Sequence, residues 1–171
     1  LQFDPVNQVF RVSRERTEID GIEARVGWTP GEATRLSLGY AAIDGRSDVD
    51  DDGRVESDLD GANISPDRLN LGWTQGWGSA WAGDWSTHLQ LNHYIDRDFE
   101  RLGVANGSFE GYTTADAFVR LDADTAGSFT LGLENLADED YISYFSQTVG
   151  DDESYFAGRG RTLSLTWQTQ F

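Results

Sequence analysis

The sequence predicts an all-β protein, an antiparallel up-and-down sheet that crosses a membrane as a segment of a β-barrel. Three observations predict this fold class. Apolar residues recur along the chain with a period of two rather than 3.6. Short and long connections alternate between the apolar segments, as they do in outer-membrane barrels. The chain is 12% aromatic and holds 19 glycines but only three prolines, a composition typical of strands, turns and curved sheets rather than of a disordered chain.

Seven segments carry the alternation, and a fragment of an eighth lies near residues 1–12. The opposite phase of each segment is polar or small, which fits either a sheet with one wet face or a barrel with a wet lumen. In chain order, the apolar phases are Ile22, Ala24, Val26 and Trp28; Leu36, Leu38 and Tyr40; Leu69, Leu71 and Trp73; Leu89, Leu91, His93 and Ile95; Ala115, Ala117, Val119 and Leu121; Phe129, Leu131 and Leu133; and Leu163, Leu165, Trp167 and Phe171.

The lengths of the connections favour the barrel. In a meander, alternate connections lie at the same end of the sheet, so we expect every long loop at one rim and every short turn at the other. The connections fall near residues 30–35, 45–67, 76–84, 99–111, 124–128 and 138–159. The acidic residues concentrate in the long loops, whereas the short-turn rim holds an aromatic band of the kind found at lipid headgroups. That band consists of Trp28, Trp77, Trp81, Trp85, Trp167 and Phe171.

A helix is the alternative for one stretch, because Trp73, Trp77, Trp81 and Trp85 are spaced by four. Four glycines interrupt that stretch, and each lowers the stability of a helix. No window of the chain approaches the roughly 18 consecutive apolar residues that a membrane helix needs. The stretch is therefore expected to be extended.

Composition excludes several classes of protein. The 171 residues hold 30 Asp and Glu against 13 Lys and Arg, a net charge of −17, so we expect no nucleic-acid partner. Because cysteine is absent, disulfides, cysteine-ligated zinc and thiol nucleophiles are excluded. The chain begins without methionine or a signal peptide, which indicates a mature product or a fragment.

Two motifs near the C-terminus are specific. The first is G-x-x-N-L-x-D-x-x-Y, and the second is an aromatic-x-G-R-G-R-T element that opens the last strand. The matching residues are Gly132, Asn135, Leu136, Asp138 and Tyr141, then Phe156, Gly158, Arg159, Gly160, Arg161 and Thr162. Together with weaker matches at 17–24 and 58–71, they make the chain resemble the C-terminal β-barrel segment of a TonB-dependent outer-membrane receptor, the siderophore-receptor type in particular.

The resemblance implies a barrel larger than this chain. Family members have a plug domain and a barrel of 22 strands, whereas 171 residues account for about seven or eight strands at about ten residues each plus loops. We therefore expect residues 1–171 to be the C-terminal part of such a barrel, with the plug domain absent. The implied activity is import of iron–siderophore complexes, energised by TonB through the missing N-terminal region, in an outer membrane of lipid and lipopolysaccharide.

The resemblance also implies that aromatic and charged side chains of the outer loops bind the substrate. The candidates in or beside the last long loop are Tyr141, Tyr144, Phe145, Tyr155, Phe156, Arg159 and Arg161. Arginine presents a planar fork that pairs with the carboxylates of an anionic chelate. The alternative is a structural role, in which the tyrosines form an outer aromatic girdle and the arginines pair with Glu134 or Asp116 inside the wall. Both roles remain open at this point.

One acidic loop resembles the start of a calcium-binding loop, although no cofactor is required by the resemblance. Asp48, Asp50 and Asp52 occupy alternate positions before Gly53, the D-x-D-x-D-G pattern in which carboxylates converge on calcium. The twelfth position holds a leucine instead of glutamate, and Asp58 is the nearest substitute. A solvated acidic loop is the alternative interpretation.

We expect no enzymatic activity. His88 and His93 fall in opposite phases of one strand and so face opposite sides. Asp138 and Asp140 are the one carboxylate pair considered for acid–base chemistry, and no nucleophile motif accompanies them.

Two alternatives to the receptor segment remain. The first is a complete small eight-stranded outer-membrane barrel with a structural or adhesive role, which requires residues 1–12 to pair with the last strand although Pro5 breaks them. The second is a soluble β-barrel that binds a small apolar ligand, which requires the apolar phase to face inward.

Overall fold

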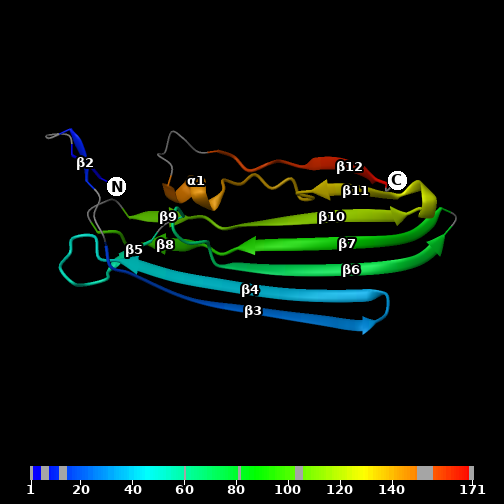
Figure 1. Cartoon of the computed structure of the whole chain (residues 1–171), viewed down its shortest axis with the longest axis horizontal. Helices are drawn as coiled ribbons and strands as arrows, with labels where there is room; N and C mark the ends of the chain where they lie inside the picture. The colour runs from blue at the N-terminus through cyan, green and yellow to red at the C-terminus, as the bar shows by residue number, and fades with distance from the viewer. Residues whose placement is uncertain are drawn as a thin grey trace.

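The computed structural model describes residues 2–4, 8–11, 15–59, 61–80, 82–102, 106–149 and 156–169. Its main feature is an antiparallel sheet in which seven long strands lie side by side in chain order (Figure 1). The all-β class and the seven predicted strands are therefore confirmed. The stretch with tryptophans spaced by four, for which a helix was the alternative, lies in two paired strands. The long strands are β3 (Thr17–Gly31), β4 (Thr34–Ser47), β6 (Arg68–Ala80), β7 (Gly83–Tyr94), β10 (Tyr112–Asp122), β11 (Ser128–Glu134) and β12 (Thr162–Gln168).

Short elements occupy the ends and the long connections. A 3-10 turn at Asp124–Ala126 lies between β10 and β11. No helix in the described part of the chain is long and apolar enough to span a membrane. The remaining elements are β1 (Gln2–Asp4), β2 (Val9–Arg11), β5 (Ser57–Asp58), β8 (Arg97–Phe99), β9 (Gly107–Phe109) and the helix α1 (Tyr144–Val149).

The main sheet has two open edges. Among the described residues, β3 pairs only with β4, and β12 pairs only with β11. The expected fragment of an eighth strand is a separate hairpin, because β1 pairs with β2 and with no strand of the main sheet where the structure describes them. The pairing with the last strand that the complete eight-stranded barrel requires is thus not observed.

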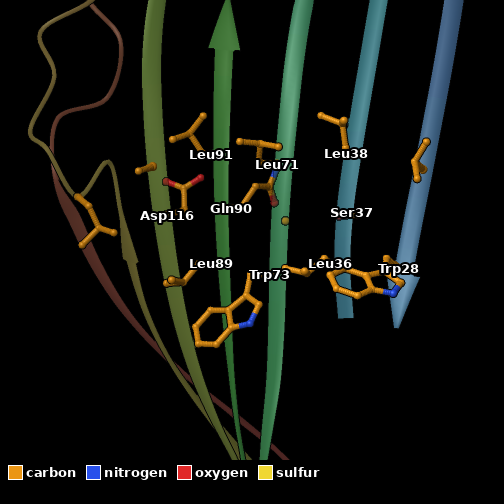
Figure 2. Close-up of a pocket in the computed structure, with 14 residues that line it drawn as sticks. Trp28, Leu36, Ser37, Leu38, Leu71, Trp73, Leu89, Gln90, Leu91 and Asp116 are labelled. Carbon is orange, nitrogen blue, oxygen red and sulfur yellow. The ribbon is translucent and has the colours of Figure 1, made fainter. Parts of the chain in front are cut away.

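The strand register brings the apolar phases onto one face. Leu38 lies opposite Val26 on one side and Leu71 on the other. Figure 2 shows leucine and tryptophan side chains of β3, β4, β6 and β7 gathered on this face around an apolar groove of about 530 Å³. Leu131 is 48% exposed and Leu165 is 73% exposed. The apolar phase therefore does not form the interior of a soluble barrel.

The two ends of the sheet differ as the connection lengths predict. The short turns at 32–33 and 123–127 lie at one end, together with the β6–β7 turn, and the long loops lie at the other (Figure 1). Trp28, Trp77, Trp85 and Trp167 all lie within a few residues of a short turn, so this part of the aromatic band is confirmed. Trp81 and Phe171 lie outside the described residues.

The packed core lies in the long loops rather than in the sheet. Phe99 and Phe109, on the β8–β9 hairpin, are each 1% exposed, and Tyr144 at the start of α1 is 6% exposed. The ring centroids of Phe109 and Tyr144 lie 4.9 Å apart at nearly a right angle. No alternation in the sequence predicts this cluster. We name the described residues of 48–67, 95–111 and 135–161 the loop cap.

Candidate ligand-binding surfaces

Hydrogen bonds that involve backbone groups and side chains join the three loops of the loop cap. The Asp58 N–H donates to the Glu100 carbonyl at 2.8 Å, which links the first loop to the second. The Gly61 N–H donates to the Thr148 hydroxyl at 3.0 Å, which links the first loop to the third. The side-chain amide of Gln147 completes the set by bonding to the backbone of the second loop. The cap is therefore a folded unit whose three loops support one another.

Two of the candidate tyrosines, Tyr141 and Tyr144, pack against other residues of the protein. Tyr144 is part of the buried aromatic core and is not accessible to a ligand. Tyr141 stacks on Tyr112 with ring centroids 4.2 Å apart. A Cβ at Gly158 would collide with the Tyr141 ring, so the backbone of this glycine lies directly against the ring. Both tyrosines support the cap, and Tyr141 also lines a pocket of about 430 Å³ at its edge.

Two candidate aromatic residues are exposed. Phe145 is 59% exposed on α1, and Phe156 is 76% exposed after the last long loop. Tyr155 lies outside the described residues. Among the candidates that the structure describes, phenylalanines are thus more accessible than Tyr141 and Tyr144.

The two candidate arginines extend from the return of the same loop. The Arg159 side chain is 75% exposed, and its Nη1 lies 4.0 Å from Oε2 of Glu134. The Arg161 backbone N–H donates to Asp138 Oδ1 at 2.9 Å, while its side chain is exposed. Asp116, the other acid considered for these arginines, instead accepts a hydrogen bond from a backbone N–H. Both guanidinium groups are accessible from solvent.

The two C-terminal motifs interlock. Asn135 is 4% exposed, and its side-chain amide donates to the carbonyls of Glu139 and Arg159 at 2.9 and 3.2 Å. Its Oδ1 accepts the Glu139 N–H at 2.9 Å. With the bond between Asp138 and the Arg161 N–H, these contacts fasten the exit of β11 to the approach of β12. The motif residues that reveal the resemblance therefore build a joint of the wall.

Three of the four candidate calcium ligands converge. Carboxylate oxygens of Asp48, Asp50 and Asp52 all lie within 4.8 Å of one another. Asp48 is buried and accepts the backbone N–H groups of Asp52 and Gly53 at 3.2 and 3.0 Å. Hydrogen bonds within the loop thus account for this arrangement, and it also matches the start of a calcium loop.

Asp58 does not join this group. Its Oδ1 pairs with Nε of Arg46 at 3.1 Å, and its Oδ2 accepts the Glu100 N–H at 2.9 Å. Asp58 therefore connects the first and second loops of the cap.

The polar face of the sheet carries a groove that the sequence analysis did not identify, hereafter the polar groove. Its volume is about 390 Å³, and Gly39 and Gly72 form part of its lining. Its polar side chains are Arg25, Ser37, Arg68, Asn70, His88, Gln90 and Tyr94, and Leu38 and Leu71 complete the lining. In the sequence these residues are only the polar or small positions of four separate strands, and the strand register is needed to show that they lie side by side.

Hydrogen bonds orient the groove side chains. The amide groups of Asn70 and Gln90 both donate to Oδ1 of Asn92, at 2.7 and 2.9 Å. The His88 Nδ1 and the Thr74 hydroxyl lie 3.0 Å apart. The floor of the groove is thus an ordered polar network.

The two histidines lie on opposite faces of β7, as the alternation predicts. His88 lines the polar groove, whereas His93 lies 2.9 Å from the Thr113 hydroxyl on the other face. They do not form a metal site together.

Comparison with known protein families identifies the family to which the chain belongs. The model of the family described as TonB dependent receptor-like, beta-barrel, matches residues 1–136. The chain belongs to the TonB-dependent receptor family. The match ends within the first C-terminal motif, so it depends mostly on residues upstream of those that carry the resemblance. No solved structure matches the chain.

Membership of the TonB-dependent receptors assigns the surfaces of the sheet. This family of transporters lies in the bacterial outer membrane and carries out TonB-coupled transport across it. The exposed apolar face then contacts lipid, and the polar face lines the lumen, because lipid-facing and lumen-facing residues alternate along barrel strands. The loop cap corresponds to the outer end, where the long loops lie, and the short turns face the periplasm.

Proposed function

We propose that the chain forms the C-terminal part of the barrel of a receptor that imports iron–siderophore complexes, with a plug domain and further strands outside it. The observation that carries the proposal is the accessible surface at the return of the last loop. There, phenylalanine and arginine side chains are exposed at the outer end of a polar wall.

The chemistry of this surface suits an iron chelate. Phe145 and Phe156 offer apolar area for the organic frame of a chelator. Arg159 and Arg161 offer planar forks that pair with carboxylates. Below the loop cap, the polar face provides hydrogen-bonding groups along the lumen. Haem, cobalamin and glycans are the other substrate classes to be compared.

The direct test uses the full-length receptor in cells that lack their other iron receptors. We expect uptake of a ferric siderophore labelled with radioactive iron, and we expect loss of that uptake when TonB is deleted. Haem, cobalamin and oligosaccharides serve as competitors at equal concentration. Import of one of these, with no ferric chelate imported, would contradict the proposal.

The surface residues are tested by matched variants of the receptor. Arg159→Gln and Arg161→Gln together are expected to raise the Kd for the chelate by roughly tenfold, since hydrogen bonds to charged groups contribute about 1.5–3 kcal/mol each at most. Arg54→Gln, an exposed arginine of the first loop, serves as the control and is expected to change the Kd little.

A further inference from the structure

We propose that the polar groove is a subsite for an anionic group, specifically a carboxylate of the transported iron chelate, held between Arg25 and Arg68. The inference rests on the proposed function, and it adds the part of the barrel wall that binds a carboxylate of the substrate. None of the ligand candidates in the loop cap contributes to this site.

The register places the two arginines on opposite sides of β4. Arg25 lies opposite Gly39 of β4, and Arg68 of β6 lies opposite Ala41. Because neighbouring strands are about 4.8 Å apart, the backbones that carry the arginines are separated by about 10 Å. Two long side chains across such a gap can contact one small anion from both sides.

Small residues keep the space between the arginines open. A Cβ at Gly39 would meet only Asn70 atoms, at 3.8 and 3.9 Å, so the region above this glycine is free of other atoms. Ser37 instead covers Gly72, whose added Cβ would lie 2.5 Å from the serine hydroxyl. The groove is therefore open above Gly39 of β4, the residue that lies opposite Arg25.

The charge of the groove is opposite to that of the chain. The chain carries a net charge of −17, yet no acidic residue lines the groove. Neither Arg25 nor Arg68 forms an ion pair with any residue that the structure describes, whereas Arg120, on the same face, pairs with Asp122 at 2.7 Å. Glu23 lies next to Arg25 on this face without lining the groove. Two unpaired guanidinium groups favour an anion.

The polar groups of the groove fit a carboxylate rather than a metal ion, and Leu38 and Leu71 add apolar lining for the rest of a chelate. Asn70, Gln90 and His88 are held in place by hydrogen bonds and supply neutral polar groups around the two charges. Arginine binds carboxylates through two parallel N–H donors, which gives directional as well as electrostatic recognition. The groove thus selects a planar anion.

The test compares two ferric chelates of the same shape, one of which has neutral amides in place of two carboxylates. The first carries two free carboxylates, and the second is the same chelate with those carboxylates converted to primary amides. Binding to the full-length receptor is measured on energy-depleted cells, and uptake is measured on energised cells. For the wild-type receptor we expect the carboxylate form to bind about tenfold more tightly or better.

Matched variants test which arginines cause the preference for the carboxylate form. In Arg25→Gln with Arg68→Gln, the ratio of the two Kd values is expected to fall severalfold, to the part that Arg159 and Arg161 contribute. Arg120→Gln should keep the wild-type ratio because Asp122 already neutralises that arginine. Arg25→Lys with Arg68→Lys is expected to retain part of the ratio, since lysine keeps the charge without the fork. Surface labelling of the receptor measures its abundance for every variant.

Each result separates the inference from the proposed function. Equal binding of the two chelates by wild-type receptor, with uptake of both, overturns the inference and leaves the function standing. An unchanged ratio in the double glutamine variant also overturns it, and a loss of receptor stability in that variant would then assign the groove to an acidic protein segment. Uptake of no ferric chelate overturns the proposed function and the inference with it.

Discussion

The loop cap and the strand wall bury their side chains in opposite ways. In the cap, Phe99, Phe109 and Tyr144 are almost completely buried among residues from two separate loops. In the wall, every residue of β3 is exposed, and the leucines of β12 are at least 70% exposed. The cap is thus organised like a soluble protein, whereas the wall completes its burial only in lipid. Substitutions in the two regions are expected to differ in kind.

The largest effect is expected in the cap core. Phe109→Ala removes a fully buried ring, and such truncations cost about 3–5 kcal/mol. The three loops should then separate, which hydrogen exchange of the full-length receptor would detect as loss of protection across residues 95–111. Phe145→Ala is the control, because that ring is 59% exposed. Equal protection in both variants would contradict a packed cap.

The wall is expected to respond to charge on one face only. Leu165→Arg places a cation on the lipid-facing side of β12 and is expected to destabilise the folded barrel by about 2–4 kcal/mol near the bilayer midplane. Thr166→Arg, one residue along the same strand, faces the lumen and should cost far less. Urea titration of the full-length receptor in lipid vesicles measures both. A cost at Thr166 equal to that at Leu165 would reject the assignment of the faces.

A smaller effect is expected at the joint between the wall and the cap. Asn135→Ala leaves the Glu139 N–H and two carbonyls without their partner, at a cost of about 1–3 kcal/mol. Asn135→Asp keeps the acceptor oxygen but loses the donor and should lie between the alanine variant and wild type. Limited proteolysis within residues 136–161 reports the loosening. No change in cleavage would show that the joint is dispensable.

The smallest effect concerns the acidic loop, where we propose that Asp48, Asp50 and Asp52 bind one calcium ion. Calcium titration of the full-length receptor should then be saturable, and the binding should disappear in Asp50→Ala and in Asp52→Ala. Asp58→Ala is expected to leave calcium affinity nearly unchanged, because Arg46 and the Glu100 N–H hold that carboxylate. A flat titration would leave a solvated acidic loop.

The strand wall could be predicted from the sequence because each strand is identified by residues that are neighbours in the chain. Alternation with a period of two identifies each strand and its two faces, as in the run from Leu163 to Trp167. Turn lengths then give the order of the strands and the separation of the two rims. The family match and the C-terminal motifs agree with that picture from different parts of the chain.

The loop cap and the polar groove could not be predicted because the residues that form them are far apart in the sequence. Phe99 and Tyr144 meet across 45 residues of sequence, and nothing near either residue indicates the other. In the sequence, Arg25 and Arg68 are polar positions on separate strands, and only the register places them at one groove. Tyr144 looked like a ligand residue because it lies in the last loop, yet its position at the start of α1 directs it into the core.

The central claim, that the apolar face contacts lipid and the polar face lines the lumen of an outer-membrane receptor, is tested most directly by site-specific labelling. The chain itself contains no cysteine, so single cysteines can be placed in a cysteine-free receptor at Leu163, Ser164, Leu165 and Thr166. A fluorophore at each site is then exposed to nitroxide-bearing lipids and to a water-soluble quencher. The account predicts lipid quenching at the two leucine positions and aqueous quenching at Ser164 and Thr166. Equal lipid quenching at all four positions, or the reverse alternation, would contradict it.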